Sequence, residues 1–332
     1  MSKHGALALS ERFAQRWGGF WWVFYRFGPP RWNVWLRSHG WGRRLVIGVP
    51  MVWLALFFLV PFVIVLKISF SEVRLAMPPF APLWEWTSET MIQLKVNVAN
   101  YRFLFTESLY ISTYLYSLKV AAVSTMWCLL LGYPMALGIA RSAPSTRNVL
   151  LMLVILPFWT SFLLRVYAWI GLLKNNGAIN NVLMAAGIID EPITMMQTDF
   201  AVYIGIVYSY LPFMILPLYT NLEKHDPQLL EAAADLGAKP MKAFLRVTLP
   251  LSTPGIVAGS LLVFIPAVGE YVIPSLLGRT DQLMIGRVLS DEFFANRDWP
   301  VASAVAICML ILLIVPIMLY QRFQNRALEK AA

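Results

Sequence analysis

The sequence predicts an all-α integral membrane protein with six transmembrane helices, and three observations support this prediction. Of the 332 residues, 58% are hydrophobic and only 14% are charged, whereas soluble proteins have about 25% charged residues. Six apolar runs each approach the ~20 residues that a tilted helix needs to cross about 30 Å of hydrocarbon. The runs are not interrupted by polar stretches, which favours helices over the strands of a membrane barrel.

The chain begins with an arm, 1–44, that is rich in Trp and Arg. This mixture suits the anionic lipid surface on the cytoplasmic side of a membrane, so an interfacial anchor is one interpretation. A poorly ordered arm that only enforces orientation is the other. Two glycines and a Pro-Pro pair, Pro29 and Pro30, argue against one continuous helix through the arm.

The six apolar runs are interpreted as membrane spans, and charge counting gives their orientation. The connecting segments that would share one side with the termini hold seventeen Lys or Arg against six Asp or Glu. The other connecting segments, without Lys67 and Lys119 at the edges of spans, hold seven against eleven. Because Lys and Arg beside spans stay on the cytoplasmic side, both termini are expected to be cytoplasmic. The basic balance then follows from topology and requires no nucleic-acid partner. The predicted spans are 45–66, 120–140, 149–173, 200–219, 255–276 and 299–320.

Motifs for catalysis, metal binding and nucleotide binding are missing from the sequence. The three histidines are isolated, there is no Gly-x-Ser-x-Gly elbow, and there is no Gly-Lys dipeptide for a phosphate-binding loop. The two cysteines, Cys128 and Cys308, lie within spans, where a thiol packs as a small hydrophobe. We therefore expect no enzyme activity, no metal site and no cofactor in this chain, and any ATP is expected to bind another chain.

The segment between the fourth and fifth spans is predicted to form two short helices. Asp226 is a favourable N-cap, and Pro227 follows it at the first helical position. Gly237 can end this helix in a left-handed conformation. Pro240 can then open the second helix.

The first of these two helices has the features of a docking element. Ala232 and Ala233 belong to a compact alanine face that another surface can approach closely. Glu231 and Asp235 lie one turn apart, and such a like-charge pair favours a basic partner. The alternative is an ordinary amphipathic cytoplasmic hairpin.

This segment resembles the "EAA" coupling loop of type I ABC-importer permeases. Val247 stands where that family often has Ile, a minor departure. The resemblance implies that the loop from Glu231 to Gly237 inserts into a cleft on an ATPase subunit and transmits its closure to the membrane helices. The residues that carry it are Glu231, Ala232, Ala233, Gly237, Val247, Leu249 and Pro250.

The resemblance implies an architecture and a set of partners. The expected permease core domain covers 110–320, with 45–68 as an added first helix and 321–332 as a cytoplasmic tail. The expected partners are a second homologous permease, a homodimeric ATPase that binds ATP and Mg, and a periplasmic binding protein, all at the lipid bilayer of the bacterial inner membrane.

Three further stretches resemble the putrescine/spermidine permease subunits, most of all the putrescine type. They are 266–274, 284–288 and 296–303, and the likeness runs from about 44 to 322. The resemblance implies translocation of a polyamine, putrescine or spermidine, delivered by a polyamine-binding protein. A permease for another small solute is the alternative.

Glu270 is the only carboxylate within the predicted spans. An ionisable group at that depth is costly unless it faces protein, water or a counter-charge, so its side chain is expected to point inward. Pro266, Gly269 and Pro274 interrupt regular helical bonding nearby, as expected where irregular backbone lines a cavity. Two alternatives stay open: contact with an amine of the substrate, and an ion pair with Arg165 at matching depth.

Aromatic side chains are the second expected component of a polyamine pathway. Ring faces attract ammonium groups by about 0.5–2 kcal/mol and cover methylene chains. Most aromatic residues in membrane helices serve packing or interface belts, so only one or two candidates are expected to act, with Tyr208 and Tyr271 favoured. The candidates are Trp159, Tyr167, Trp169, Tyr208, Tyr210 and Tyr271.

Acidic residues also precede the fourth and sixth spans. Most are expected to be solvated, and some are expected to meet the periplasmic binding protein by electrostatic steering. They are Asp190, Glu191, Asp199, Asp281, Asp291, Glu292 and Asp298.

Two rival transport classes fit the sequence less well. A secondary transporter driven by an ion gradient would require carboxylates in several spans and an internal repeat. A channel would require a Gly-rich filter segment. None of these features is evident in the sequence.

Overall fold

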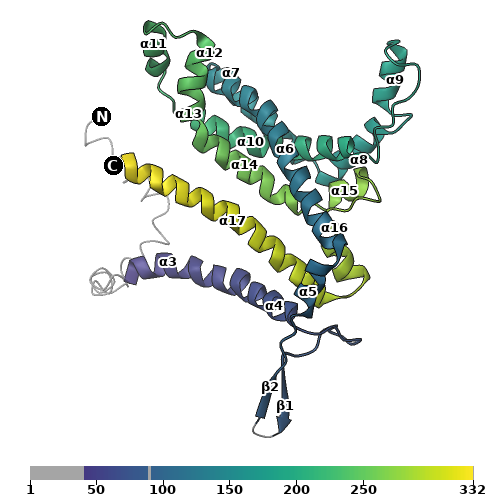
Figure 1. Ribbon diagram of the computed structural model, residues 1–332. Helices are drawn as coiled ribbons and strands as arrows, with labels where there is room; N and C mark the ends of the chain where they lie inside the picture. The colour runs from purple at the N-terminus through teal and green to yellow at the C-terminus, as the bar shows by residue number, and fades with distance from the viewer. Residues whose placement is uncertain (1–40, 89–90, 332) are drawn as a thin grey trace, which may run out of the picture. The chain divides into compact units, whose positions relative to one another are not determined.

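The computed structural model describes residues 41–88 and 91–331, and most of them are helical (Figure 1). The chain divides into two compact units, Met1–Ile64 and Val65–Ala332. The arm predicted at 1–44 lies outside the described residues except for its last four, which begin the first helix.

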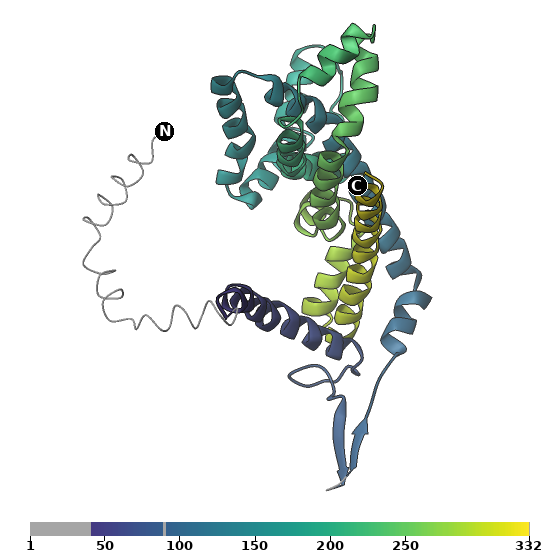
Figure 2. The same ribbon diagram turned by 90° about the vertical axis from the view of Figure 1, so that its left-hand side faces the viewer.

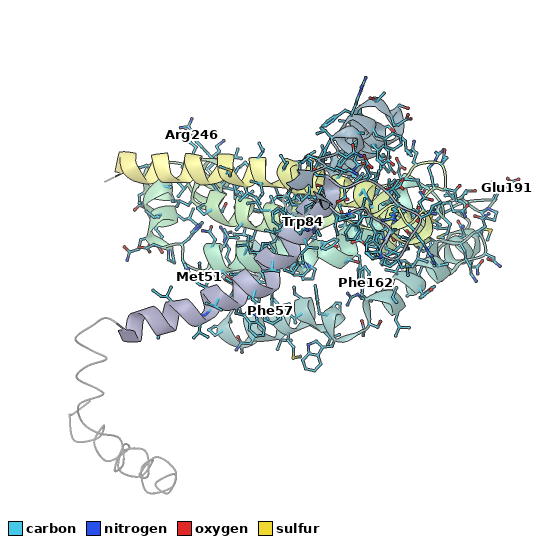
Figure 3. All side chains as sticks on the ribbon, turned by 90° about the horizontal axis from the view of Figure 1, so that it is seen from below. Met51, Phe57, Trp84, Phe162, Glu191 and Arg246 are labelled. Carbon is cyan, nitrogen blue, oxygen red and sulfur yellow. The ribbon has the colours of Figure 1, made fainter. Side chains whose placement is uncertain are left out.

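The first unit contains an apolar helix whose side chains face outward. It runs through α3 (Trp41–Leu54) and a π-helical turn, η1 (Ala55–Leu59), and α4 (Val60–Ser69) continues it into the second unit. Met51 and Phe57 project from it and are 59% and 57% exposed (Figure 3). An 18-residue stretch within Val46–Ser69 has a mean hydropathy of 2.7, which is that of a membrane span, so the helix predicted at 45–66 is confirmed.

A β-hairpin follows this helix, and the all-α prediction missed it. Strands β1 (Trp84–Ser88) and β2 (Met91–Leu94) pair antiparallel, with Trp84 opposite Leu94. Figures 1 and 2 show the hairpin extending from the end of the bundle where α5 (Ala99–Thr106) begins. The alternation of Trp and polar residues in β1 is typical of a strand, but a search for long apolar runs does not detect so short an element.

Three long helices form the centre of the second unit: α6 (Ser108–Arg141), α10 (Asp199–Leu222) and α14 (Thr253–Val268). Glycines let them approach closely. A Cβ added at Gly132 of α6 would lie 3.0 Å from Met214 of α10, and one added at Gly259 of α14 would lie 2.8 Å from the Met214 sulfur. Met214 therefore packs between the other two helices, which is consistent with small residues at membrane helix interfaces.

The third predicted span, 149–173, is not one continuous helix. The structure has α7 (Pro144–Ile155) and a 3₁₀ turn, η2 (Leu156–Trp159), then a 91° bend, then α8 (Phe162–Leu173), with α9 (Ala178–Ala185) after it. Arg165 stabilises the bend because its guanidinium donates hydrogen bonds to the Pro157 and Thr160 carbonyl oxygens at the end of η2.

The fifth predicted span, 255–276, is also interrupted. α14 ends at Val268, and the next three residues, Gly269, Glu270 and Tyr271, form a break. A short helix, α15 (Val272–Leu277), follows the break. The irregular backbone predicted from Pro266, Gly269 and Pro274 is thus confirmed at Gly269, whereas Pro266 and Pro274 lie inside α14 and α15. The chain continues through α16 (Ile285–Ser290) and η4 (Asp291–Ala295) to the last helix, α17 (Trp299–Ala331), which extends past the predicted end of the sixth span.

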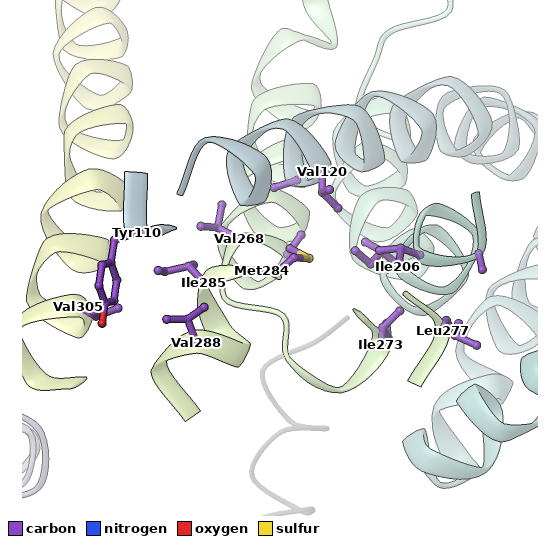
Figure 4. Close-up of a cluster of buried hydrophobic side chains, with 14 of the residues drawn as sticks. Tyr110, Val120, Ile206, Val268, Ile273, Leu277, Met284, Ile285, Val288 and Val305 are labelled. Carbon is purple, nitrogen blue, oxygen red and sulfur yellow. The ribbon is translucent and has the colours of Figure 1, made fainter. Parts of the chain in front are cut away.

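Buried apolar side chains join these elements in two clusters, and the larger one includes residues of α6, α10, α15 and α16. Figure 4 shows Met284 between Val120 of α6 and Ile206 of α10, with Ile273 of α15 and Ile285 of α16 close by. All five are fully buried. The two short helices that follow the fifth-span break, α15 and α16, are therefore anchored in the core.

The lengths and hydropathies of the helices give fewer spans than the six predicted. Three helices among the described residues qualify alone, and up to five do if each of two bent pairs counts as one span. In α17 the apolar part within the described side chains is Trp299–Val315, which is shorter than a full span. The membrane architecture is supported, and the count of six is not reproduced by these criteria.

Candidate functional site

The segment between α10 and α14 forms the two short helices that the sequence predicts. α11 (Gln228–Asp235) begins after Asp226, whose carboxylate accepts a hydrogen bond from the Gln228 N–H at 3.0 Å. α12 (Pro240–Ala243) follows and continues through η3 (Phe244–Thr248) and α13 (Leu249–Leu251) toward α14. In Figures 1 and 2 these elements lie at the end of the bundle opposite the β-hairpin.

The C-terminus of α11 is a Schellman motif centred on Gly237. The Gly237 N–H bonds to the Ala234 carbonyl oxygen at 2.8 Å, and the Ala238 N–H bonds to that of Ala233 at 3.0 Å. Gly237 has a φ of 76°, the left-handed region that glycine occupies without steric cost. The predicted left-handed end of the helix is confirmed.

Replacing Gly237 by Ala should weaken the end of α11 without causing a clash. No atom lies within 4 Å of a Cβ added there, so only the backbone conformation is penalised, by about 1 kcal/mol. Amide hydrogen exchange across 228–240, followed by mass spectrometry, should accelerate about fivefold in Gly237→Ala. Lys239→Ala, at an exposed neighbouring position, should leave the exchange unchanged. Equal exchange in both variants would contradict the role of Gly237.

The outer surface of α11 combines carboxylates with apolar side chains. Glu231, Ala232 and Asp235 are exposed, and Ala233 is half-buried. Leu236 is 89% exposed. Large apolar side chains with such high exposure mark interaction surfaces when charged groups flank them.

The second group of predicted residues lies at the break in the fifth span. Glu270 is buried, with 7% of its surface exposed, so the inward orientation is confirmed. Its Oε1 accepts hydrogen bonds from the N–H groups of Val272 and Ile273 at 3.1 and 3.3 Å, which caps the first turn of α15. Its Oε2 accepts a hydrogen bond from the Tyr210 hydroxyl of α10 at 2.5 Å.

The structure does not form the alternative ion pair between Glu270 and Arg165. Within the part of the chain that the structure describes, no Lys, Arg or His lies within 4.0 Å of the Glu270 carboxylate. Arg165 instead bonds to carbonyl oxygens at the α7–α8 bend and lies near the rings of Phe158 and Phe162. The matching depth that motivated this alternative does not bring the two groups together, because the third span bends.

The predicted aromatic residues are dispersed over several elements. Tyr271 follows Glu270 directly and is 43% exposed, and Tyr208 of α10 is 39% exposed. Trp159 at the end of η2 and Tyr167 of α8 are also exposed. Among the described residues, no ring contact or hydrogen bond joins any of these four to Glu270. The aromatic partner of Glu270 is Tyr210, which sequence reasoning considered but did not favour.

Tyr208 borders an apolar groove of about 470 Å³ between α6, α8 and α10. Its ring contacts Trp169 edge to face, with centroids 5.5 Å apart. No Asp or Glu lines this groove, so it offers no charge to hold a polycation. It suits apolar contacts.

Two of the acidic residues before the last span are paired with arginines. Asp281 accepts two hydrogen bonds from Arg279, at 2.8 and 2.5 Å, and this pairing lowers the pKa of the Asp281 carboxyl. Asp291 lies 3.7 Å from Arg287. These carboxylates are partly neutralised within the chain.

Two more are engaged at the start of α17. Glu292 accepts hydrogen bonds from Tyr110 at 2.7 Å and from Asn296 at 2.9 Å. Asp298 caps α17 by accepting from the Val301 N–H at 3.0 Å, and burial raises the pKa of the Asp298 carboxyl. Their first role is therefore to fix the loop before the last helix.

Of the three acidic residues before the fourth span, one accepts a side-chain hydrogen bond and two are exposed. Asp199 accepts a hydrogen bond from Tyr116 of α6 at 2.9 Å. Asp190 and Glu191 are exposed, with Glu191 at the edge of the molecule in Figure 3. Among the described residues, no group of three or more His, Cys, Asp or Glu could hold a metal ion.

Comparisons with known proteins agree with this arrangement. Residues 128–330 match the family described as the binding-protein-dependent transport system inner membrane component. The chain is 40% identical over 288 residues to the spermidine/putrescine transport system permease protein PotB of Haemophilus influenzae, covering 87% of this chain and 96% of that protein. It is 39% identical over 278 residues to the protein of the same name from Escherichia coli K12, covering 84% and 96%.

Solved structures show the same fold. A chain of a bacterial alginate ABC transporter, crystallised with an alginate-pentasaccharide-bound periplasmic protein, superposes with a TM-score of 0.65 at 15% identity, covering 87% of this chain and 96% of that one. At this identity the similarity shows the fold alone. The predicted membrane fold of a type I ABC-importer permease is confirmed.

Proposed function

This chain belongs to the family of binding-protein-dependent transport system inner membrane components, and from this premise we propose that it translocates a polyamine as a subunit of an ATP-driven importer. The family makes it a multi-pass inner-membrane permease and not an enzyme. The observation that carries the polyamine assignment is 40% identity over 96% of a spermidine/putrescine permease. Putrescine is the proposed preferred cargo, with spermidine as the second.

The proposed complex places the energy source outside this chain. Two copies of an ATPase bind ATP and Mg, a second homologous permease completes the passage, and a periplasmic polyamine-binding protein delivers the cargo. Both termini of this chain are cytoplasmic, in line with the excess of Lys and Arg in the segments that share their side. The cytoplasmic arm 1–44, the first helix 45–68, the permease core 110–320 and the tail 321–332 are the proposed divisions of the chain.

The geometry of α11 supports ATPase docking. Its capped start at Asp226 and its Schellman end at Gly237 hold eight helical residues in a defined shape. The exposed side chains are the proposed contact surface: Glu231, Ala232 and Asp235 for a basic partner and Leu236 for an apolar pocket, with Ala233 permitting close approach. A short rigid helix transmits displacement better than a loose loop.

The proposed polyamine pathway passes the break in the fifth span. Glu270 offers a carboxylate that no cationic side chain neutralises within the described residues, and an ammonium group is its natural counter-charge. Tyr271 and Tyr208 are proposed to contact the methylene chain, with Trp159 and Tyr167 as further candidates. A second permease would supply additional carboxylates.

Uptake into proteoliposomes tests this function. The chain is co-purified with its ATPase, second permease and binding protein, and ATP is enclosed in the vesicles on the ATPase side. Radiolabelled putrescine should accumulate, with spermidine as competitor, and no uptake should occur with ADP in place of ATP. If polyamines are not carried while another binding protein stimulates ATP hydrolysis, the importer class stands and the polyamine assignment is wrong.

A further inference from the structure

We infer that Tyr210 is a positioning residue that fixes the Glu270 carboxylate for one ammonium group of the cargo. The inference rests on the proposed function, because it assumes that a cation reaches Glu270. It adds a residue that the sequence analysis did not favour. It also gives the two carboxylate oxygens different roles, because Oε1 accepts the α15 N–H groups and Oε2 accepts the Tyr210 hydroxyl.

The hydrogen bonds of Glu270 leave one acceptor position free. An ionised carboxylate has about four acceptor sites, two on each oxygen. On Oε1 both are taken by the Val272 and Ile273 N–H groups, and on Oε2 one is taken by the Tyr210 hydroxyl. A single site on Oε2 remains, and an ammonium N–H can fill it.

None of the three donors is a cation. They are two backbone N–H groups at the start of a helix and one tyrosine hydroxyl. The Glu270 carboxylate therefore has no ion-pair partner among the described residues. A passing ammonium group can pair with it and leave again without displacing a lysine or arginine.

The Tyr210 ring is fixed by packing, so its hydroxyl has a defined direction. It contacts both buried apolar clusters of the second unit, and its ring centroid lies 6.1 Å from that of Phe213. The helices that carry the pair are also in close contact, because a Cβ added at Gly205 of α10 would lie 2.7 Å from Ile273 of α15. Without the hydroxyl, Oε2 would lose the bond that orients it, while the ring would stay in place.

Removing only this hydroxyl tests the inference. In proteoliposomes containing the whole complex, Tyr210→Phe should lower putrescine uptake about tenfold, the effect of losing one hydrogen bond to a charged group. Assembly and basal ATP hydrolysis should stay the same. Tyr114→Phe is the matched control, because it removes a hydroxyl that bonds the Val305 carbonyl oxygen in the same bundle at 2.6 Å, and uptake should change less than twofold.

A double-mutant cycle separates positioning from a merely structural role. Glu270→Gln keeps an oxygen for the α15 N–H groups and removes the charge, and it should lower uptake about tenfold. If Tyr210 acts through the carboxylate, Tyr210→Phe in the Glu270→Gln background should cause little further loss.

The same fold loss in both backgrounds, or wild-type uptake in Tyr210→Phe, would overturn the inference while leaving the polyamine function intact. Absence of polyamine uptake by the wild-type complex would instead reject the proposed function, and this inference with it.

Discussion

Glu231→Arg should abolish ATP-driven uptake while the permease still reaches the membrane and assembles. Glu231 lies on the exposed face of α11, and nothing in the described residues uses its carboxylate. If the ATPase presents a basic surface there, charge reversal replaces attraction by repulsion and costs roughly 3 kcal/mol or more at a partly desolvated contact. That cost corresponds to a loss of about 100-fold in productive coupling.

The measurement compares uptake and ATP hydrolysis at equal amounts of assembled complex. The control is Glu72→Arg, an exposed charge reversal before the β-hairpin, which should retain uptake. A second comparison, Glu231→Gln, removes the charge without reversing it and should give an intermediate loss. Full uptake in Glu231→Arg would show that α11 is not the coupling element. The segment between α10 and α14 would then be an ordinary amphipathic cytoplasmic hairpin.

The coupling loop could be predicted closely from the sequence because its signals are local. Asp226, Pro227 and Gly237 each act within four residues of their own position, through a cap, a first-turn proline and a left-handed glycine. The structure shows the predicted end at Gly237, and its start differs by one residue. α11 begins at Gln228 with Pro227 at the N-cap position, and the Asp226 carboxylate accepts the Gln228 N–H hydrogen bond.

The break in the fifth span could be predicted only in part. Local prolines and glycines predicted irregular backbone, and the cost of a buried charge predicted an inward Glu270. The partner of that charge could not be predicted, because Tyr210 lies 60 residues away on another helix. The proposed partner Arg165 was placed by counting residues along a straight span, and the 91° bend invalidates that count.

The short elements outside the spans were missed for a different reason. The β-hairpin at Trp84–Ser88 and Met91–Leu94 is too brief to produce an apolar run. The acidic residues before the last helix lie in a segment of ordinary loop composition. Only the folded chain shows that Glu292 accepts a hydrogen bond from Tyr110 and that Asp298 caps α17.

Gly286→Ala should destabilise the permease strongly, because Gly286 of α16 packs directly against the backbone of the fifth-span break. A Cβ added at Gly286 would clash with the Gly269 carbonyl oxygen and lie 2.9 Å from that of Glu270. Backbone atoms cannot rotate away as a side chain can, so α16 or the break must shift. Overpacking of this kind costs about 3 kcal/mol, and the unfolding temperature in detergent should fall by roughly 6–10 °C.

A matched substitution isolates the clash from the change of residue type. Gly138 lies in α6 with no atom within 4 Å of an added Cβ, so Gly138→Ala should be neutral or stabilising by up to about 1 kcal/mol. In Gly286→Ala the displaced Glu270 turn should also lower putrescine uptake, because the Tyr210 hydroxyl and the α15 N–H groups can no longer hold the carboxylate together. Equal unfolding temperatures for the two variants would mean that α16 does not contact the break as closely as the structure shows.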